Sequence, residues 1–92
     1  MKALIALSIS ALLLAGCSAK TSNRDSCATL LQQGWSELSL AEADGFAGTV
    51  SYSKALSLLT AAKAQQQFEG YAGCREKADR ALFYIRESRE GR

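Results

Sequence analysis

Apolar residues recur every three or four positions from about residue 25 to the C-terminus, which is the spacing of one helix face. Glycine-containing breaks at 44–48 and 69–70 divide this pattern into three stretches. The apolar positions are, stretch by stretch, Cys27, Leu30, Leu31, Gly34, Trp35, Leu38 and Ala41; Tyr52, Ala55, Leu58, Leu59 and Ala62; and Tyr71, Cys74, Ala78, Ala81, Leu82 and Ile85. The chain also contains no proline, and we predict an all-α domain over residues 25–92.

The same breaks predict where the helices begin and end. Asp25 or Ser26 is expected to cap the first helix, and the second is expected to run from Thr49 or Ser51 to about Phe68. The third helix follows the second glycine break. Connections this short favour antiparallel packing of consecutive helices, so the expected product is a three-helix domain.

A different pattern occupies residues 1–16. A cationic start at Lys2 is followed by a run of Ala, Leu and Ile up to Leu14, and then by small residues, which is typical of a secretory signal peptide. With about 14 residues, the run is too short to cross a ~30 Å hydrocarbon core as a helix. Residues 17–24 are small, polar and unpatterned, and we expect them to form a flexible tether to the helical domain.

The apolar run ends in Leu14-Ala15-Gly16-Cys17, which resembles the lipobox of bacterial lipoproteins. In that family the thiol is alkylated with diacylglycerol, the chain is cut before the cysteine, and the new amino terminus is usually acylated. The resemblance implies that Cys17 is lipidated and that a membrane anchor holds the protein facing the periplasm. Because Gram-negative inner-membrane lipoproteins typically carry Asp at the next position, Ser18 favours the outer membrane. The alternative is that Cys17 merely lies near an ordinary signal cleavage site.

Two further cysteines remain in the predicted mature chain. Its length of about 75 residues supports only a small core, which often needs a covalent crosslink. Export would place Cys27 and Cys74 in an oxidising compartment, where paired thiols persist as disulfides. A bond between them closes a loop of roughly 48 residues and contributes ~4 kcal/mol on the chain-entropy model. The alternatives are two buried cysteines that never meet or an intermolecular bond.

Residues 70–82 resemble the second half of a tetratricopeptide repeat. That family places an aromatic residue after a glycine turn, then small and apolar residues at helical spacing; those places are occupied here by Tyr71, Cys74, Ala78, Ala81 and Leu82. The preceding helix supplies large and small packing residues where the first helix of such a repeat has them: Leu58, Leu59, Ala61 and Ala62. The resemblance covers about 34 residues and implies a helical hairpin, to which the first predicted helix is added.

Composition excludes most reaction chemistry. The chain has no histidine, which removes the commonest general base, the Ser-His triad and nearly all zinc catalysis. It also lacks the Gly-x-Ser-x-Gly motif, and Glu37, Glu42 and Asp44 are not expected to face a cleft. We therefore expect no enzyme, no cofactor and no metal. Eleven Lys and Arg residues against nine Asp and Glu leave the chain almost neutral, which argues against nucleic-acid binding.

Aromatic side chains are the candidates for a contact surface. We expect Trp35 to lie in the core because it falls on the first apolar stripe. Phe68 and Phe83 form the candidate interaction surface, with packing against the first helix as the alternative. The sequence thus predicts a non-enzymatic interaction or structural module of the cell envelope, with an unidentified envelope protein as partner. The alternative function is an inhibitor of an envelope enzyme or a small-ligand-binding lipoprotein.

Overall fold

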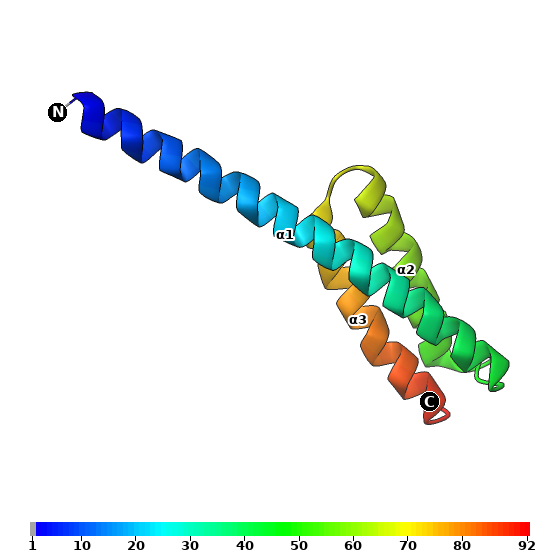
Figure 1. The fold of residues 1–92 in the computed structure, drawn as a ribbon. Coiled ribbons are helices and arrows are strands. Elements are labelled where there is room, and N and C mark those ends of the chain that lie inside the picture. The colour runs from blue at the N-terminus through cyan, green and yellow to red at the C-terminus, as the bar shows by residue number, and fades with distance from the viewer. Residues whose placement is uncertain (1) are drawn as a thin grey trace.

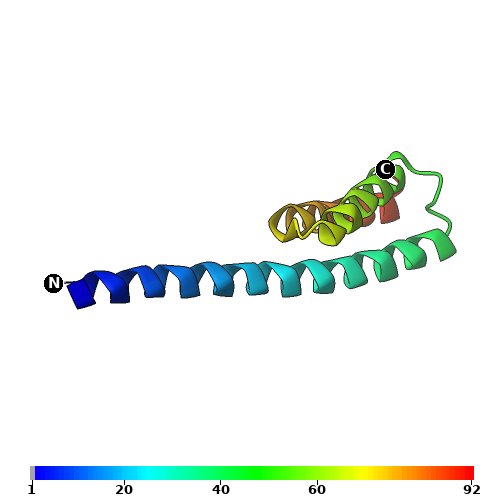
Figure 2. The same ribbon diagram turned by 90° about the horizontal axis from the view of Figure 1, so that it is seen from above.

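The computed structural model describes the backbone of residues 2–92 and the side chains of residues 20–92. The chain forms three helices, α1 (Lys2–Ala43), α2 (Val50–Gln67) and α3 (Tyr71–Arg89), and no strand occurs within the described residues. Consecutive helices run antiparallel, so that α1 and α3 point the same way, and α1 extends beyond the other two at its N-terminal end (Figures 1 and 2). The predicted all-α fold of three helices is confirmed.

The boundaries of α2 and α3 also follow the predictions. Thr49 caps α2, since its hydroxyl accepts a hydrogen bond from the amide of Tyr52 at 3.2 Å and donates one to the carbonyl of Phe46 at 2.9 Å. Phe68 ends α2, and Gly70 precedes α3. Between them Glu69 adopts a left-handed backbone with φ 60°, which reverses the chain within a tight turn.

The predicted start of the first helix at Asp25 or Ser26 is wrong, because α1 is already helical upstream of that point. Nothing between Gly16 and Gly34 interrupts a helix, since that segment contains neither glycine nor proline. Residues 20–24, expected to be a flexible tether, also contact the rest of the domain. Lys20 pairs with Glu69 at 3.2 Å, and the Asn23 side chain accepts a hydrogen bond from Arg75 at 3.2 Å.

The signal peptide at 1–16 and the lipidation of Cys17 concern residues whose side chains lie outside the described part of the chain. Over the residues that the structure does describe, none of the helices is long and apolar enough to span a bilayer.

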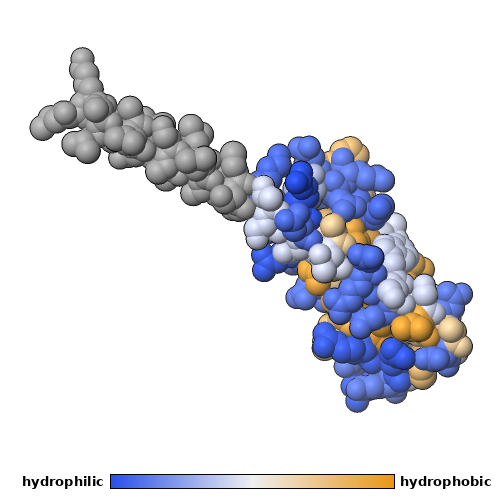
Figure 3. Space-filling model, in the orientation of Figure 1, coloured by the Kyte–Doolittle hydropathy of each residue, from blue (hydrophilic) through white to orange (hydrophobic). Residues whose placement is uncertain are grey.

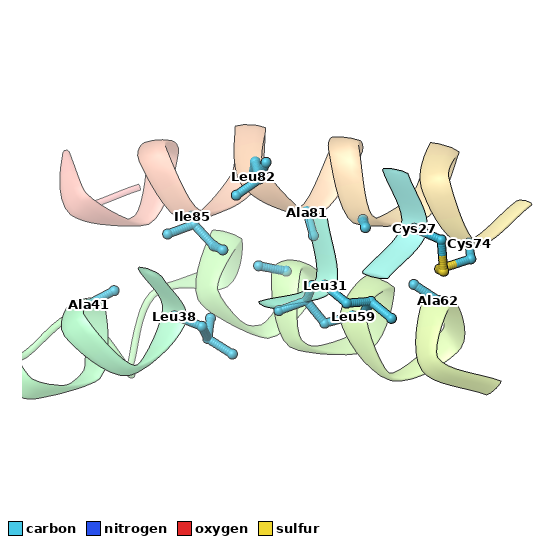
Figure 4. Close-up of a cluster of buried hydrophobic side chains, with 12 residues drawn as sticks. Cys27, Leu31, Leu38, Ala41, Leu59, Ala62, Cys74, Ala81, Leu82 and Ile85 are labelled. Carbon is cyan, nitrogen blue, oxygen red and sulfur yellow. A yellow bond between two sulfur atoms is a disulfide. The ribbon is translucent and has the colours of Figure 1, made fainter. Parts of the chain in front are cut away.

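Each helix contributes one narrow seam to the core. Most buried positions on α1 and α3 alternate in steps of four and three residues, which is the heptad spacing of coiled-coil packing: Cys27, Leu31, Gly34, Leu38 and Ala41 on α1, and Cys74, Ala78, Ala81, Ile85 and Ser88 on α3. Leu82, next to Ala81, is buried as well. The α2 seam contains Ser51, Ala55, Leu59 and Ala62. The predicted inward residues of α3 are all buried or half-buried, as Figure 4 shows for Ala81, Leu82 and Ile85.

Trp35 departs from the prediction that it lies in the core. Its side chain is 37% exposed and belongs to no part of the buried cluster. The reason is that Gly34, one residue earlier, occupies the seam, and a helix turns by about 100° per residue. A Cβ atom on Gly34 would lie 2.6 Å from the Cδ2 atom of Leu59. Leu59 therefore packs directly on the α1 backbone, and the space toward which Trp35 was expected to point is already filled.

The two ends of the bundle differ, and we name them here. The disulfide end contains Cys27, Cys74 and the α2–α3 turn at 68–70. The loop end contains the α1–α2 connection at 44–49 and the C-terminal residues 90–92. Both are visible in Figure 1, where the C-terminus lies beside the end of α1.

Candidate functional site

The Cys27 and Cys74 sulfur atoms lie 1.95 Å apart, at bonding distance, with their Cα atoms 5.5 Å apart. Both residues are completely buried at one end of the core, beside Ala62 (Figure 4). The pairing that the cysteine count favoured is therefore the one that the fold brings together. The disulfide joins α1 to α3 between residues that are 47 positions apart in the sequence. Because these two helices are parallel, other residues 47 positions apart, such as Leu38 and Ile85, also lie at the same level along the bundle.

Phe68 and Phe83, the predicted contact residues, are both exposed, at 85% and 53%. The predicted alternative, that they pack against the first helix, is wrong. They do not form one patch, however, because Phe68 lies in the α2–α3 turn while Phe83 lies 12 residues into α3 from Tyr71. At 1.5 Å per residue this is a separation of about 18 Å along the helix axis.

Phe83 adjoins an open groove between α2 and α3. The ring of Tyr84 lies edge-on to that of Phe83, with centroids 5.2 Å apart, and the Lys54 ammonium lies 5.3 Å from the Tyr84 ring centroid. The groove has a volume of about 480 Å³ and is lined by Val50, Ser53, Lys54, Ser57, Leu58, Arg80 and Tyr84. These lining residues include two cations and no carboxylate, so the groove suits an anionic group with an apolar part.

Sequence reasoning missed Lys54, Arg80 and Tyr84. Spacing along α3 does place Arg80 and Tyr84 one turn apart on the same face. Nothing in the sequence, however, states which face of α2 meets that side of α3. The groove exists only once the two helices are aligned by their seams.

Outside this groove, apolar side chains are dispersed over the surface. On the face seen in Figure 3, orange areas are small and separated by polar residues. Apart from Val50 in the groove, the larger exposed apolar side chains belong to different parts of the three helices and the α2–α3 turn: Trp35, Leu40, Leu56, Phe68 and Phe83.

Two ionisable side chains within residues 20–92 have shifted pKa values. Partial burial, and then the charge and hydrogen bond of Glu42, raise the pKa of Tyr52, whose hydroxyl lies 3.4 Å from the Glu42 carboxylate. A hydrogen bond and the charge of Glu87, together with Glu90, raise the pKa of Arg92. Both shifts favour the protonated form of the side chain, which already predominates at neutral pH. Among the described residues no group of three or more Cys, Asp or Glu side chains is placed to hold a metal ion.

Comparisons with family models, curated proteins and solved structures gave no match to this chain. The resemblances to the lipobox and to the tetratricopeptide repeat therefore rest on the residues that carry them.

Proposed function

We propose that this chain is a lipoprotein of the bacterial cell envelope, anchored through Cys17 and exposing a helical interaction module to the periplasm. The observation that carries the proposal is the Leu14-Ala15-Gly16-Cys17 sequence at the end of an apolar run next to the N-terminus. One acyl chain holds a protein to a bilayer only marginally, whereas two or more hold it stably. A triacylated cysteine would therefore supply a lasting anchor without a spanning helix.

The pairing of the other two cysteines supports this proposal. The chain contains three cysteines, and Cys27 lies at bonding distance from Cys74, which leaves Cys17 as the thiol for modification. A buried disulfide is also a feature of exported proteins, since the cytosol keeps thiols reduced. Export and lipidation thus account for all three cysteines together.

A non-enzymatic interaction role is proposed because the chain lacks histidine and offers instead an exposed aromatic beside a helix groove. The surface around Phe83, Tyr84 and the groove between α2 and α3 is the proposed contact site for an envelope protein. The polar and apolar character of the groove also favours a second candidate, in which a small anionic ligand binds near Lys54 and Arg80. Tetratricopeptide-like packing of α2 on α3 remains part of this proposal.

The anchor is tested by Cys17→Ala in the full chain, expressed in a Gram-negative host with radiolabelled palmitate. We expect loss of label and release from the membrane fraction, because the acylated thiol is gone. The control is the double variant Cys27→Ser/Cys74→Ser, which removes the other two cysteines but should keep the label. A labelled, membrane-bound Cys17→Ala protein contradicts the proposal. Ser18→Asp should in addition move the protein from the outer to the inner membrane.

The contact site is tested by placing a photo-crosslinking amino acid at Phe83 and, as the control, at Ser36, which is exposed on α1. A reproducible crosslink to one envelope protein from position 83 alone supports the interaction module. If that protein is a hydrolase whose activity falls on binding, the inhibitor function replaces the structural one. No crosslink, together with Lys54→Ala-sensitive binding of an anionic small molecule, favours the ligand-binding candidate.

A further inference from the structure

Phe68 is the most exposed of the large apolar side chains that the structure describes, at 85%. The backbone that carries it is nevertheless fixed by hydrogen bonds. Its own amide donates a hydrogen bond to the carbonyl of Ala64 at 3.3 Å, and the amide of Gly70 donates one to the carbonyl of Gln65 at 2.7 Å. The aromatic ring is thus presented to the surroundings by a hydrogen-bonded turn.

This turn lies close to the predicted lipid. Glu69, next to Phe68, pairs with Lys20 at 3.2 Å, and Lys20 follows Cys17 by three residues. Three residues span about 4.5 Å along a helix axis and at most about 11 Å in fully extended chain. Even in extended chain, Cys17 is therefore at most about 11 Å from the Lys20 backbone, and the Lys20–Glu69 ion pair joins that residue to the α2–α3 turn.

We infer that the α2–α3 turn docks on the bilayer that holds the anchor, with Phe68 inserted into the interface between headgroups and acyl chains. The inference rests on the proposed lipidation of Cys17. Apolar aromatic rings gain free energy by leaving water for this layer, and the acyl chains keep the turn next to it. Arg24, which is exposed, has a stem long enough to follow the apolar layer while its charge reaches phosphate groups.

Insertion of the apolar Phe68 ring contributes more to this docking than charge does. Lys20 is already paired with Glu69, and Asp25 and Glu76 lie near the same end of the bundle as Arg24 and Arg75. Cations and carboxylates are thus balanced at the docking surface. Docking is therefore expected to change little between vesicles with and without anionic lipid.

Docking at this turn fixes which surfaces remain free. Phe83 lies about 18 Å farther along α3, and the loop end lies about 35 Å from Lys20 along α1. The groove beside Phe83 consequently stays clear of the membrane, where a periplasmic partner can reach it.

The test uses the full lipidated protein, reconstituted into phosphatidylethanolamine–phosphatidylglycerol vesicles that contain a lipid with a nitroxide quencher near the headgroup. Trp35→Phe removes the single tryptophan, and either Phe68→Trp or Phe83→Trp then adds one back. Both positions are exposed, so neither change disturbs the core. We expect several-fold stronger quenching and a blue-shifted emission at position 68 compared with position 83.

Equal quenching at the two positions, in protein that floats with the vesicles, overturns the docking and leaves the anchor intact. Protein that neither floats nor carries acyl mass overturns both the anchor and the docking. Replacing phosphatidylglycerol with phosphatidylcholine should leave the quenching at position 68 nearly unchanged; its loss there would contradict apolar insertion as the driving interaction.

Discussion

At the disulfide end a covalent bond joins two helices, whereas at the loop end hydrogen bonds and an exposed ion pair hold the chain together. Cys27 and Cys74 are fully buried where α1 and α3 meet. At the loop end, Arg89 pairs with Asp44 at 2.9 Å, with both side chains about half exposed. The amide of Ser51 there donates to the backbone oxygen of Arg92 at 3.1 Å.

The difference assigns separate physical roles to the two ends. A disulfide that closes a long loop contributes ~4 kcal/mol by restricting the unfolded chain. A single hydrogen bond contributes about 1 kcal/mol net, and an exposed ion pair often less. The disulfide end, next to the proposed anchor, is therefore the stable base of the bundle. We therefore expect the loop end to open first.

Removing the disulfide should have the largest effect on stability. We expect Cys27→Ser/Cys74→Ser to lower the free energy of unfolding by ~4 kcal/mol, because the unfolded chain regains the entropy of an open loop. Urea unfolding followed by circular dichroism measures the loss, with the reduced wild-type protein as a second sample. A change in the free energy of unfolding under ~1 kcal/mol would show that the disulfide stabilises the bundle no more than a single hydrogen bond at the loop end does.

Midway along the bundle, Gly34→Leu tests the close contact between α1 and α2. The new side chain would collide with Leu59, and overpacking of this kind costs about 1–3 kcal/mol. Gly48→Leu is the matched control, since no atom lies within 4 Å of a Cβ placed there. If both variants unfold at the same urea concentration, Leu59 does not pack on the α1 backbone as described.

At the loop end, Thr49→Ala removes the cap of α2. We expect a loss of about 1 kcal/mol, because the amide of Tyr52 loses its acceptor. Thr60→Ala is the control, since the Thr60 hydroxyl donates only to the carbonyl of Leu56 within an exposed part of α2. Hydrogen exchange in Thr49→Ala should accelerate at the first turn of α2 and leave the amides around Cys74 unchanged. Equal acceleration at both ends would argue that the bundle opens as one unit.

The smallest effect is expected for Arg89→Gln. Its ion pair with Asp44 is exposed to solvent, and such pairs contribute ~0.2–1 kcal/mol. Thermal unfolding at low and high salt should show a small difference from wild type that disappears as salt screens the charges. A loss of stability as large as that of the disulfide variant would show that the loop end, and not the disulfide end, contributes most to the stability of the bundle.

Much of the fold could be predicted because local chemistry decides it. Thr49 has the side chain of a helix cap, and Gly70 lies where the chain must turn, so both boundaries of α2 could be located in the sequence. Cys27 and Cys74 were the only pair available once Cys17 was assigned to the lipid. Spacing alone placed nearly all of the α3 core correctly.

The start of α1 and the place of Trp35 depended on contacts between helices. Polar residues at 20–24 carry no helical pattern, yet Glu69 and Arg75 meet them from the other side of the bundle. Trp35 shares the apolar stripe with Gly34, and only the position of Leu59 decides which of the two faces the core. Sequence spacing cannot separate neighbouring positions on one stripe.

The candidate contact residues show the same limit. Helical spacing did not decide whether the Phe68 and Phe83 side chains point toward the core or toward solvent, so the sequence left their burial open. Their exposure, and the proximity of Tyr84 to Lys54, emerge only when α2 and α3 are packed together.

The intact mass of the native protein, extracted from membranes with detergent, tests the central claim most directly. The account predicts a chain that begins at Cys17, carries the mass of its acyl groups and is two hydrogens lighter for one disulfide. A chain that begins at Met1 with three unmodified thiols would contradict it.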